Sequence, residues 1–518
     1  MIAEILIFIL TTLVAFAFYS YYKNQNVFKS KDMKFLPGFP MFGNIIKSSF
    51  GKNHMFYDLD RVYRAFPGES YVGYVEGFVP LYLIRDPSII RLITVKDFDH
   101  FVDHRRFATD DLFNESLFMM TGEKWRHMRS TLSPAFTGSK MRKMVPFMCQ
   151  TSQNIVEHLK ETEGQNINVG ELIRRYTNDV IASTAFGIEV NSVKDQKNRF
   201  YEYGQKIINF SSVQKAKIFL SVIFPKSGFQ IFPKDSLDFF KHIVTSTMEY
   251  REKNNVERPD MIQLLMEASK GTLDGPTEDK SDTVGFATTE LTAVKPKGEV
   301  QKWSTDQLAA QAFIFFLAGF DSTASVLVMA FHELALNPEV QETLYQEVRE
   351  HHEKHGTVTY DGVPTLKYLD GVLNETLRKW PPTLILDRVC QKPYTLPPPR
   401  EGGKPYTVKE GEVIFNFVNS LHMDEKYYPE PEKFKPERFS DENKQNIKLS
   451  AFIPFGSGPR SCIASRFAIL ELKVLLYYVS LNFILQKCEK TRDPIELTPG
   501  EFQVRCIGGS WVKFQARK

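Results

Sequence analysis

Two long apolar stretches dominate the pattern of hydrophobic and polar positions. The first, from Ile5 to Tyr22, contains no charged residue and is about as long as a helix that crosses a bilayer. The second, from Gln307 to Ser325, is apolar around nearly its whole circumference, so we expect a buried helix. Helical periodicity prevails in the middle of the chain, and short strand patterns lie near both ends. The pattern predicts a mainly α fold with small β-sheets.

The first stretch predicts a membrane anchor. Lysines follow it and none precedes it, so the positive-inside rule leaves the rest of the chain in the cytosol. A cleaved secretory signal is the alternative, because Ala15-Phe16-Ala17 fits a cleavage pattern, but this triplet lies inside the apolar run. We predict a transmembrane anchor at residues 1–24, a basic, proline-containing hinge at 25–45, and one large domain at 46–518.

Two other segments stand out by composition. Residues Lys270 to Gly298 are polar and lack any period, which predicts a long exposed loop before the buried helix. Residues Phe219 to Phe240 combine many aromatic side chains with lysines, which suits a second membrane contact beside a substrate entrance. A pair of ordinary core helix ends would show the same pattern.

Composition excludes several classes of protein. The chain has 518 residues, 42% of them hydrophobic, with 43 phenylalanines, which is ample for a large core. Its formal net charge of +3 is too small to indicate a nucleic-acid partner. Five cysteines are few, odd in number and scattered, so we expect no disulfide framework and a reducing compartment. They are Cys149, Cys390, Cys462, Cys488 and Cys506.

Cys462 lies in the glycine-rich segment Phe455-Gly456-Ser457-Gly458-Pro459-Arg460-Ser461-Cys462, which leads into an apolar helix. Backbone N–H groups, the start of a helix dipole and the nearby Arg460 would stabilise a thiolate there. The two glycines would let the backbone approach the sulfur closely. This pattern suits a cysteine that ligates haem iron, although a buried free cysteine beside a turn is the alternative.

The segment resembles the proximal loop of the cytochrome P450 family, which carries F-x-x-G-x-R-x-C-x-G. The chain matches every position from Phe455 through Arg460 and Cys462, and Ala464 replaces the last glycine. The resemblance covers nearly the whole chain. It implies the cytochrome P450 fold, mainly α with small sheets, and a heme b whose iron is axially ligated by the Cys462 thiolate.

The buried helix carries Ala318-Gly319-Phe320-Asp321-Ser322-Thr323. Small residues leave space above a flat cofactor, while an acid and two alcohols can relay protons. In the family this motif is A-G-x-[DE]-T-[ST], so Ser322 occupies the usual threonine position. The resemblance implies catalytic roles for Asp321, Ser322 and Thr323, and leaves open which alcohol is the relay.

Two further sets of residues match family motifs. Glu375-Thr376-Leu377-Arg378 and the later Arg438 match the ExxR and PERF motifs, which implies a buried ionic cluster that holds the haem loop. The resemblance also implies that cationic and aromatic side chains bind the haem and its propionates. These are Trp125, Arg129, Arg388, Arg460 and, as an additional contact, Arg105. Taken singly, an arginine is more often a surface charge than a haem ligand, but the family spacings favour Arg129 and Arg460 as haem contacts.

The resemblance implies a monooxygenase that inserts one atom of O₂ into a lipophilic xenobiotic, lipid or hormone-like compound. No G-x-G-x-x-G pattern follows a strand, so we expect that NADPH does not bind this chain. The resemblance implies that the electrons come from NADPH through a partner flavoprotein reductase, with a cytochrome b-type protein as a further donor. The reductase would dock on basic residues, unless these form a solvated face. They are Arg126, Lys140, Arg142 and Lys143. Such proteins are anchored in the endoplasmic reticulum membrane.

Three segments are most similar to the insect microsomal, xenobiotic-metabolising members of the family: Ser133–Thr137, Arg258–Leu265 and Asp387–Cys390. The expected substrate pocket is largely apolar. Its residues are Phe107, Phe113, Phe118, Ile314, Leu317, Thr383 and Leu386, with Ala318 over the haem. Two alternatives remain: a reductase-independent haem-thiolate isomerase or dehydratase, and a non-catalytic lipophile- or haem-binding protein.

Overall fold

The computed structural model describes residues 1–106, 111–224, 228–270, 284–289, 294, 296, 302–501 and 503–518. Phe107 of the predicted pocket lies outside these residues. Helices account for most of the described chain. They are α1 Ile2–Lys29, α2 Ile46–Ser49, α3 Met55–Arg64, α4 Pro87–Arg91, α5 Asp111–Asn114, α6 Gly122–Leu132, α7 Gly138–Glu161, α8 Val169–Ala185, α9 Arg199–Ile208, α10 Ser212–Ile223, α11 Lys234–Asn254, α12 Met261–Lys270, α13 Thr305–Leu336, α14 Pro338–His355, α15 Lys367–Lys379, α16 Val418–His422 and α17 Ser465–Asn482.

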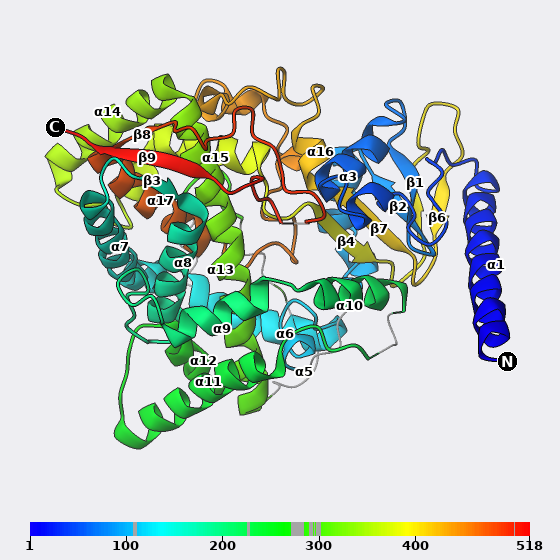
Figure 1. Cartoon of the computed structure of the whole chain (residues 1–518), viewed down its shortest axis with the longest axis horizontal. Helices are drawn as coiled ribbons and strands as arrows, with labels where there is room; N and C mark the ends of the chain where they lie inside the picture. Colours follow the sequence, from blue (N-terminus) through cyan, green and yellow to red (C-terminus); the bar gives the residue numbers. More distant parts are fainter. Residues whose placement is uncertain are drawn as a thin grey trace.

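The strands form three small sheets, so the predicted mainly α class is confirmed. They are β1 Tyr71–Glu76, β2 Val79–Ile84, β3 Asn166–Asn168, β4 Ile385–Val389, β5 Tyr394–Leu396, β6 Tyr406–Val408, β7 Val413–Phe417, β8 Phe483–Gln486 and β9 Trp511–Ala516. The largest sheet has the order β1-β2-β7-β4, and only its β2–β7 pair is parallel. The strand-rich part lies at one end of the molecule and the helix-rich part at the other (Figure 1).

The predicted buried helix is α13, which crosses the middle of the helix-rich part (Figure 1). Ser304 and Gln307 form a capping box at its start, in which each side chain bonds the backbone of the other residue. α13 packs most closely on α8. A Cβ on Gly319 would lie 2.7 Å from Cδ1 of Ile181, so a larger residue here would have to displace the end of the Ile181 side chain.

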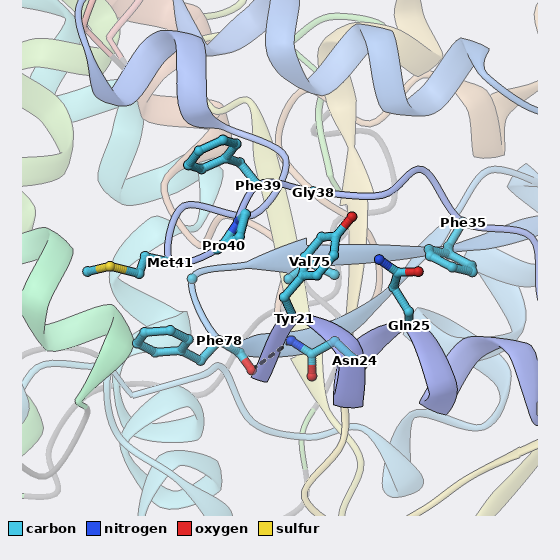
Figure 2. A pocket seen from close by; sticks show the side chains of 11 residues that line it. Tyr21, Asn24, Gln25, Phe35, Gly38, Phe39, Pro40, Met41, Val75 and Phe78 are labelled. Atoms are coloured by element: carbon cyan, nitrogen blue, oxygen red, sulfur yellow. Dashed lines mark hydrogen bonds between the residues drawn. The ribbon is translucent and has the colours of Figure 1, made fainter. Parts of the chain in front are cut away.

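α1 is longer than the predicted anchor and stands at the edge of the strand-rich part (Figure 1). Its first half exposes large apolar side chains, whereas Phe28 near its end is fully buried with its ring against Gly73 of β1. Asn24 donates a hydrogen bond of 3.0 Å to the carbonyl of Phe78 (Figure 2). The predicted hinge at 25–45 therefore begins inside a helix whose last turns dock on the sheet.

A shallow pocket lies between the last turns of α1, the following loop and the β1–β2 turn (Figure 2). Tyr21, Phe39, Met41 and Phe78 are among its lining residues. None of the lining residues belongs to the Cys462 loop, so this pocket is separate from the predicted haem site. Both α1 and α13 are long and apolar enough to span a membrane, but most of α13 is buried inside the protein.

The prediction of an exposed loop at Lys270–Gly298 is wrong for residues 284–289. Val284 is fully buried and Ala287 is nearly so, because this short segment packs against the helical core. The aromatic segment Phe219–Phe240 is mixed: Leu220 and Phe224 are exposed, whereas Phe240 is fully buried.

Candidate active site

The Cys462 loop lies just before α17. The Cys462 N–H donates to the carbonyl of Phe455 over 2.8 Å, and Phe455 is half-buried against the core. Gly456 and Gly458 both have positive φ angles, 75° and 73°. A Cβ on Gly458 would lie only 1.7 Å from the carbonyl oxygen of Thr94. This glycine is therefore required by a crossing backbone, whereas the sequence had suggested an approach to the sulfur.

The groups around the Cys462 sulfur shift the pKa of its thiol in opposite directions. Burial raises the pKa of the thiol, while the Ala464 N–H and the Arg129 guanidinium lower it in part. Burial is also the largest influence on the thiol pKa at Cys390 and Cys506, which it raises. Each of these thiols donates to a backbone carbonyl. An arginine favours the thiolate at Cys462, where it is Arg129, and at Cys506, where it is Arg492, but not at Cys390.

One face of α13 is open although most of the helix is buried. Ile314 and Leu317 are half-buried, Ala318 is exposed and Ser322 is half-buried, whereas Thr323 is only 3% exposed. The Ser322 hydroxyl donates to the Ala318 carbonyl, as alcohols in helices commonly do. Because Gly319 packs on α8, only Ala318 of the small pair lies on the open face. The structure thus separates the two alcohols by burial.

Asp321 is held by the C-terminal segment of the chain. Its carboxylate accepts a hydrogen bond of 2.7 Å from Gln503 Nε2 and one of 3.0 Å from Arg505 Nη2. Sequence reasoning missed both partners, because no motif surrounds them and they lie far from Asp321 in the chain. The acid and the Ser322 alcohol therefore have separate hydrogen-bond partners.

The ExxR residues form a buried ionic cluster. Arg378 donates to both carboxylate oxygens of Glu375 at 2.7 and 2.8 Å, and both side chains are fully buried. Arg438 Nε lies 3.3 Å from the same carboxylate and is 13% exposed. Arg378 also donates to the carbonyls of His422 and Pro431, so the cluster joins α15 to the chain segment before the Cys462 loop.

Three buried guanidinium groups gather near Cys462. Burial lowers the pKa of Arg129 and of Arg388 to about 10 in each case. Burial lowers the pKa of Arg460 well below its ordinary value, and Arg388 and Arg129 act in the same direction. Arg460 stacks on Trp125, with 4.0 Å between the guanidinium carbon and the ring centroid, and pairs with Asp103 at 3.3 Å.

The bonding of these arginines is incomplete. The Nε atoms of Arg129 and Arg388 are buried and have no hydrogen-bond partner among the described residues. Buried cations clustered around a cysteine suit an anionic ligand, and the propionates of haem supply such charges. The residues present therefore fit the cofactor implied by the sequence. Arg105 differs, because it pairs with Glu76 at 2.6 Å and lies over the ring of Phe415.

The predicted pocket residues differ in how far their side chains are exposed. Phe113 is buried against Phe232, with 5.3 Å between ring centroids, whereas Phe118 is 40% exposed and stacks on His104. Thr383 is exposed and Leu386 is half-buried. Phe118 and Thr383 therefore present surface that a ligand can contact, while Phe113 belongs to the core.

Most of the basic residues expected to bind a reductase are paired with acids of the same chain. Arg126 lies 2.6 Å from Asp99. The N–O distance is 3.3 Å in the pair Lys140–Glu267 and 2.7 Å in the pair Arg142–Asp361. Lys143 is exposed. The expected patch is therefore a mixed-charge surface, and its docking role stays a prediction.

Comparison with known proteins agrees with this geometry. The sequence profile of the family described as "Cytochrome P450" matches residues 33–505. "Probable cytochrome P450 9f2" of Drosophila melanogaster is 39% identical, over 98% of this chain and 99% of its own length. "Cytochrome P450 9e2" of Blattella germanica is 38% identical, over 95% and 94%. "Cytochrome P450 6k1" of the same species is 34% identical, over 95% and 93%. The chain therefore belongs to the cytochrome P450 family, whose cofactor is a haem with a cysteine thiolate ligand.

Proposed function

We propose that this protein is a membrane-bound monooxygenase that takes electrons from NADPH through a partner flavoprotein reductase. One oxygen atom of O₂ enters a C–H bond of a lipophilic molecule, and the other leaves as water with two protons and two electrons. A cytochrome b-type protein is a further electron donor. The observation that carries the proposal is the group of three buried arginines that includes Arg460 of the Cys462 loop, in which the Nε atoms of Arg129 and Arg388 have no hydrogen-bond partner among the described residues.

Cys462 is the residue that we assign as the haem ligand. Arg129, Arg388 and Arg460 would hold the two propionates, and Trp125 fixes Arg460 by stacking on it. When bound, the haem supplies O₂ activation, which the thiolate favours by donating electron density to the iron. The Glu375–Arg378–Arg438 cluster touches neither substrate nor haem in this proposal, and its role is to hold the chain that precedes the loop.

Ser322 is the alcohol that we assign to proton delivery. Its hydroxyl lies on the open face of α13 and donates to the Ala318 carbonyl. When the hydroxyl rotates away from that carbonyl, it can pass its proton onward and take another from water. Asp321, the residue before Ser322, supplies a carboxylate that Gln503 and Arg505 orient. Thr323 is buried and serves packing.

The substrate class follows from the surface near Phe118, Ile314 and Leu317, which is apolar or aromatic. Such a surface favours a lipophilic small molecule, a xenobiotic or an endogenous lipid or hormone-like compound. The exposed first half of α1 and the exposed apolar residues of the α10 segment, Val213, Leu220 and Phe224, support anchoring in the endoplasmic reticulum membrane with the domain on the cytosolic side.

The test is reconstitution of the full chain in lipid with NADPH and a reductase, followed by a depletion screen of lipophilic compounds. We expect reductase-dependent NADPH oxidation, an oxygenated product and the red-shifted Soret band of a thiolate-ligated ferrous carbonyl complex. Cys462→Ser should abolish all three, and Cys488→Ser, a half-buried cysteine elsewhere, should abolish none. Turnover of a peroxide without NADPH would instead favour an isomerase or dehydratase, and ligand binding without turnover would favour a carrier.

A further inference from the structure

A short segment of this chain, residues 284–289, packs beside the Cys462 loop. Val284 is fully buried, and its carbonyl accepts a hydrogen bond of 2.7 Å from Lys473 Nζ of α17. The Phe286 N–H donates to Asp370 of α15 over 3.0 Å, and Asp370 pairs with Lys473 at 2.7 Å. The segment is thus fastened to the buried ion pair that links α15 and α17.

Side-chain packing holds the same segment from the other side. The Phe286 ring lies 5.4 Å from the ring of Phe439 and 5.7 Å from that of Phe452, measured between centroids. Phe452 lies three residues before Phe455, the first residue of the Cys462 loop. A Cβ on Gly285 would lie 2.2 Å from Asp370 Oδ1, so any larger residue here would have to displace the Asp370 carboxylate.

The contact with the loop itself is made by Thr289. Its hydroxyl donates to the Cys462 carbonyl over 3.2 Å, and its N–H donates to Ser465 Oγ over 3.3 Å. The two hydroxyl oxygens of Thr289 and Ser465 lie 2.8 Å apart. One assignment uses every donor once: Ser465 O–H to Thr289, Thr289 O–H to Cys462 and Thr289 N–H to Ser465.

We propose that Thr289 is a positioning residue that fixes the Cys462 carbonyl through this network, and thereby keeps the cysteine oriented as a thiolate ligand. The inference rests on the proposed role of Cys462. Thr289 touches neither the sulfur nor the substrate, so it acts only by limiting rotation of the peptide that follows the ligand. A loop held at one more point should lose haem and its thiolate form more slowly.

The experiment compares Thr289→Val, Thr289→Ser and Thr288→Val in the full-length holoprotein. Thr289→Val keeps the shape and removes the hydroxyl, and Thr289→Ser restores it. Thr288 offers a matched control, because its buried Oγ1 has no hydrogen-bond partner among the described residues. Two quantities are measured: the rate of haem transfer to excess apomyoglobin, and the fraction of ferrous carbonyl complex that loses the red-shifted Soret band with time.

We expect Thr289→Val to raise both rates about three- to tenfold, the size expected for one hydrogen bond, with Thr289→Ser and Thr288→Val close to wild type. Equal rates in Thr289→Val and Thr288→Val would overturn the inference, as would a rise in the rate of haem transfer without loss of the thiolate band. If Thr289→Val does not fold, Ser465→Ala removes the partner hydroxyl and carries the same comparison. A wild-type chain without the band would overturn the Cys462 assignment first, which separates the two failures.

Discussion

The Arg505 guanidinium lies 3.0 Å from the Asp321 carboxylate and ties the open part of α13 to the C-terminal segment. Arg505 and Gln503 together occupy both carboxylate oxygens, so the acid is oriented by residues far from it in the chain. The pair lies near the surface, with 25% and 16% of the side chains exposed, and is open to competition by water.

If Arg505 orients Asp321 for proton delivery, the two residues act as a unit. We expect Asp321→Asn and Arg505→Gln each to lower the product formed per NADPH, and the double variant to lower it no further than either change alone. Product and hydrogen peroxide are quantified against NADPH consumed. Arg349→Gln, which removes an exposed pair with Glu353 on α14, serves as the control and should stay coupled. Additive losses would show that the two side chains act independently.

The two neighbouring alcohols should differ in effect because they differ in exposure. Ser322→Ala is expected to divert electrons to hydrogen peroxide, since it removes the hydroxyl on the open face, and general acid groups contribute typically about 10²-fold or more. Thr323→Val conserves volume at a buried position and should leave product per NADPH nearly unchanged. The measurement is the product-to-peroxide ratio at saturating substrate. The reverse order of effects would assign the relay to Thr323.

Removing the charge of Arg378 or of Arg438 from the ionic cluster should lower the stability of the protein by different amounts. Arg378→Gln removes the bidentate partner of the fully buried Glu375 carboxylate, and breaking a buried ion pair typically costs about 3 to 5 kcal/mol. Arg438→Gln removes a longer contact from a side chain that is 13% exposed, so its cost should be smaller. Chemical unfolding and the haem-to-protein absorbance ratio report the two effects. Equal losses for both variants would contradict the ranking by burial.

Glu471 of α17 should make stability depend on pH. Burial raises the pKa of its carboxyl group well above its ordinary value of 4.5, so at neutral pH the folded chain keeps a proton that the unfolded chain releases. Folding then takes up a proton at neutral pH. The free energy of unfolding therefore falls as the pH rises above 4.5, the ordinary pKa of this carboxyl group.

Glu471→Gln removes this titration while keeping the shape of the side chain. The variant should have the same Tm as wild type at acid pH and a higher Tm than wild type at alkaline pH, with the difference growing as pH rises. Differential scanning at several pH values measures it. The control is Glu353→Gln, an exposed acid that should leave the pH profile unchanged. A pH-independent difference would show that Glu471 is ionised when folded.

The end of α1 should matter for folding, whereas its beginning should matter only for anchoring. Removal of residues 1–22 deletes the exposed apolar half and should release the domain from membranes with its Tm nearly unchanged. Phe28→Ala should cost about 3–5 kcal/mol, because it empties a fully buried site against Gly73. Sedimentation with microsomes and thermal unfolding separate the effects. Tyr22→Ala, at an exposed position of the same helix, is the control.

Local chemistry made several features predictable. The N-terminal helix was predicted from the length of its apolar run and the central helix from its apolar circumference. The Cys462 loop was predicted from glycines, a cation and a cysteine within a few residues. Each of these depends on neighbours in the chain, so the residue order carries the information. The Glu375–Arg378 pair was also predictable from the sequence, because residues three apart on a helix lie on the same face.

Other features involve residues that are distant in the chain and have no fixed spacing. The binding of Asp321 by Arg505, the contact of Thr289 with the Cys462 carbonyl and the need for Gly458 beside Thr94 all arise where separate segments cross. The sequence by itself therefore determined the fold class and the family, and it predicted Cys462 as the haem ligand. Only the tertiary structure decided which alcohol of α13 is open, which arginines keep unpaired donors and which segment supports the loop, because burial and long-range hydrogen bonding depend on how the helices pack.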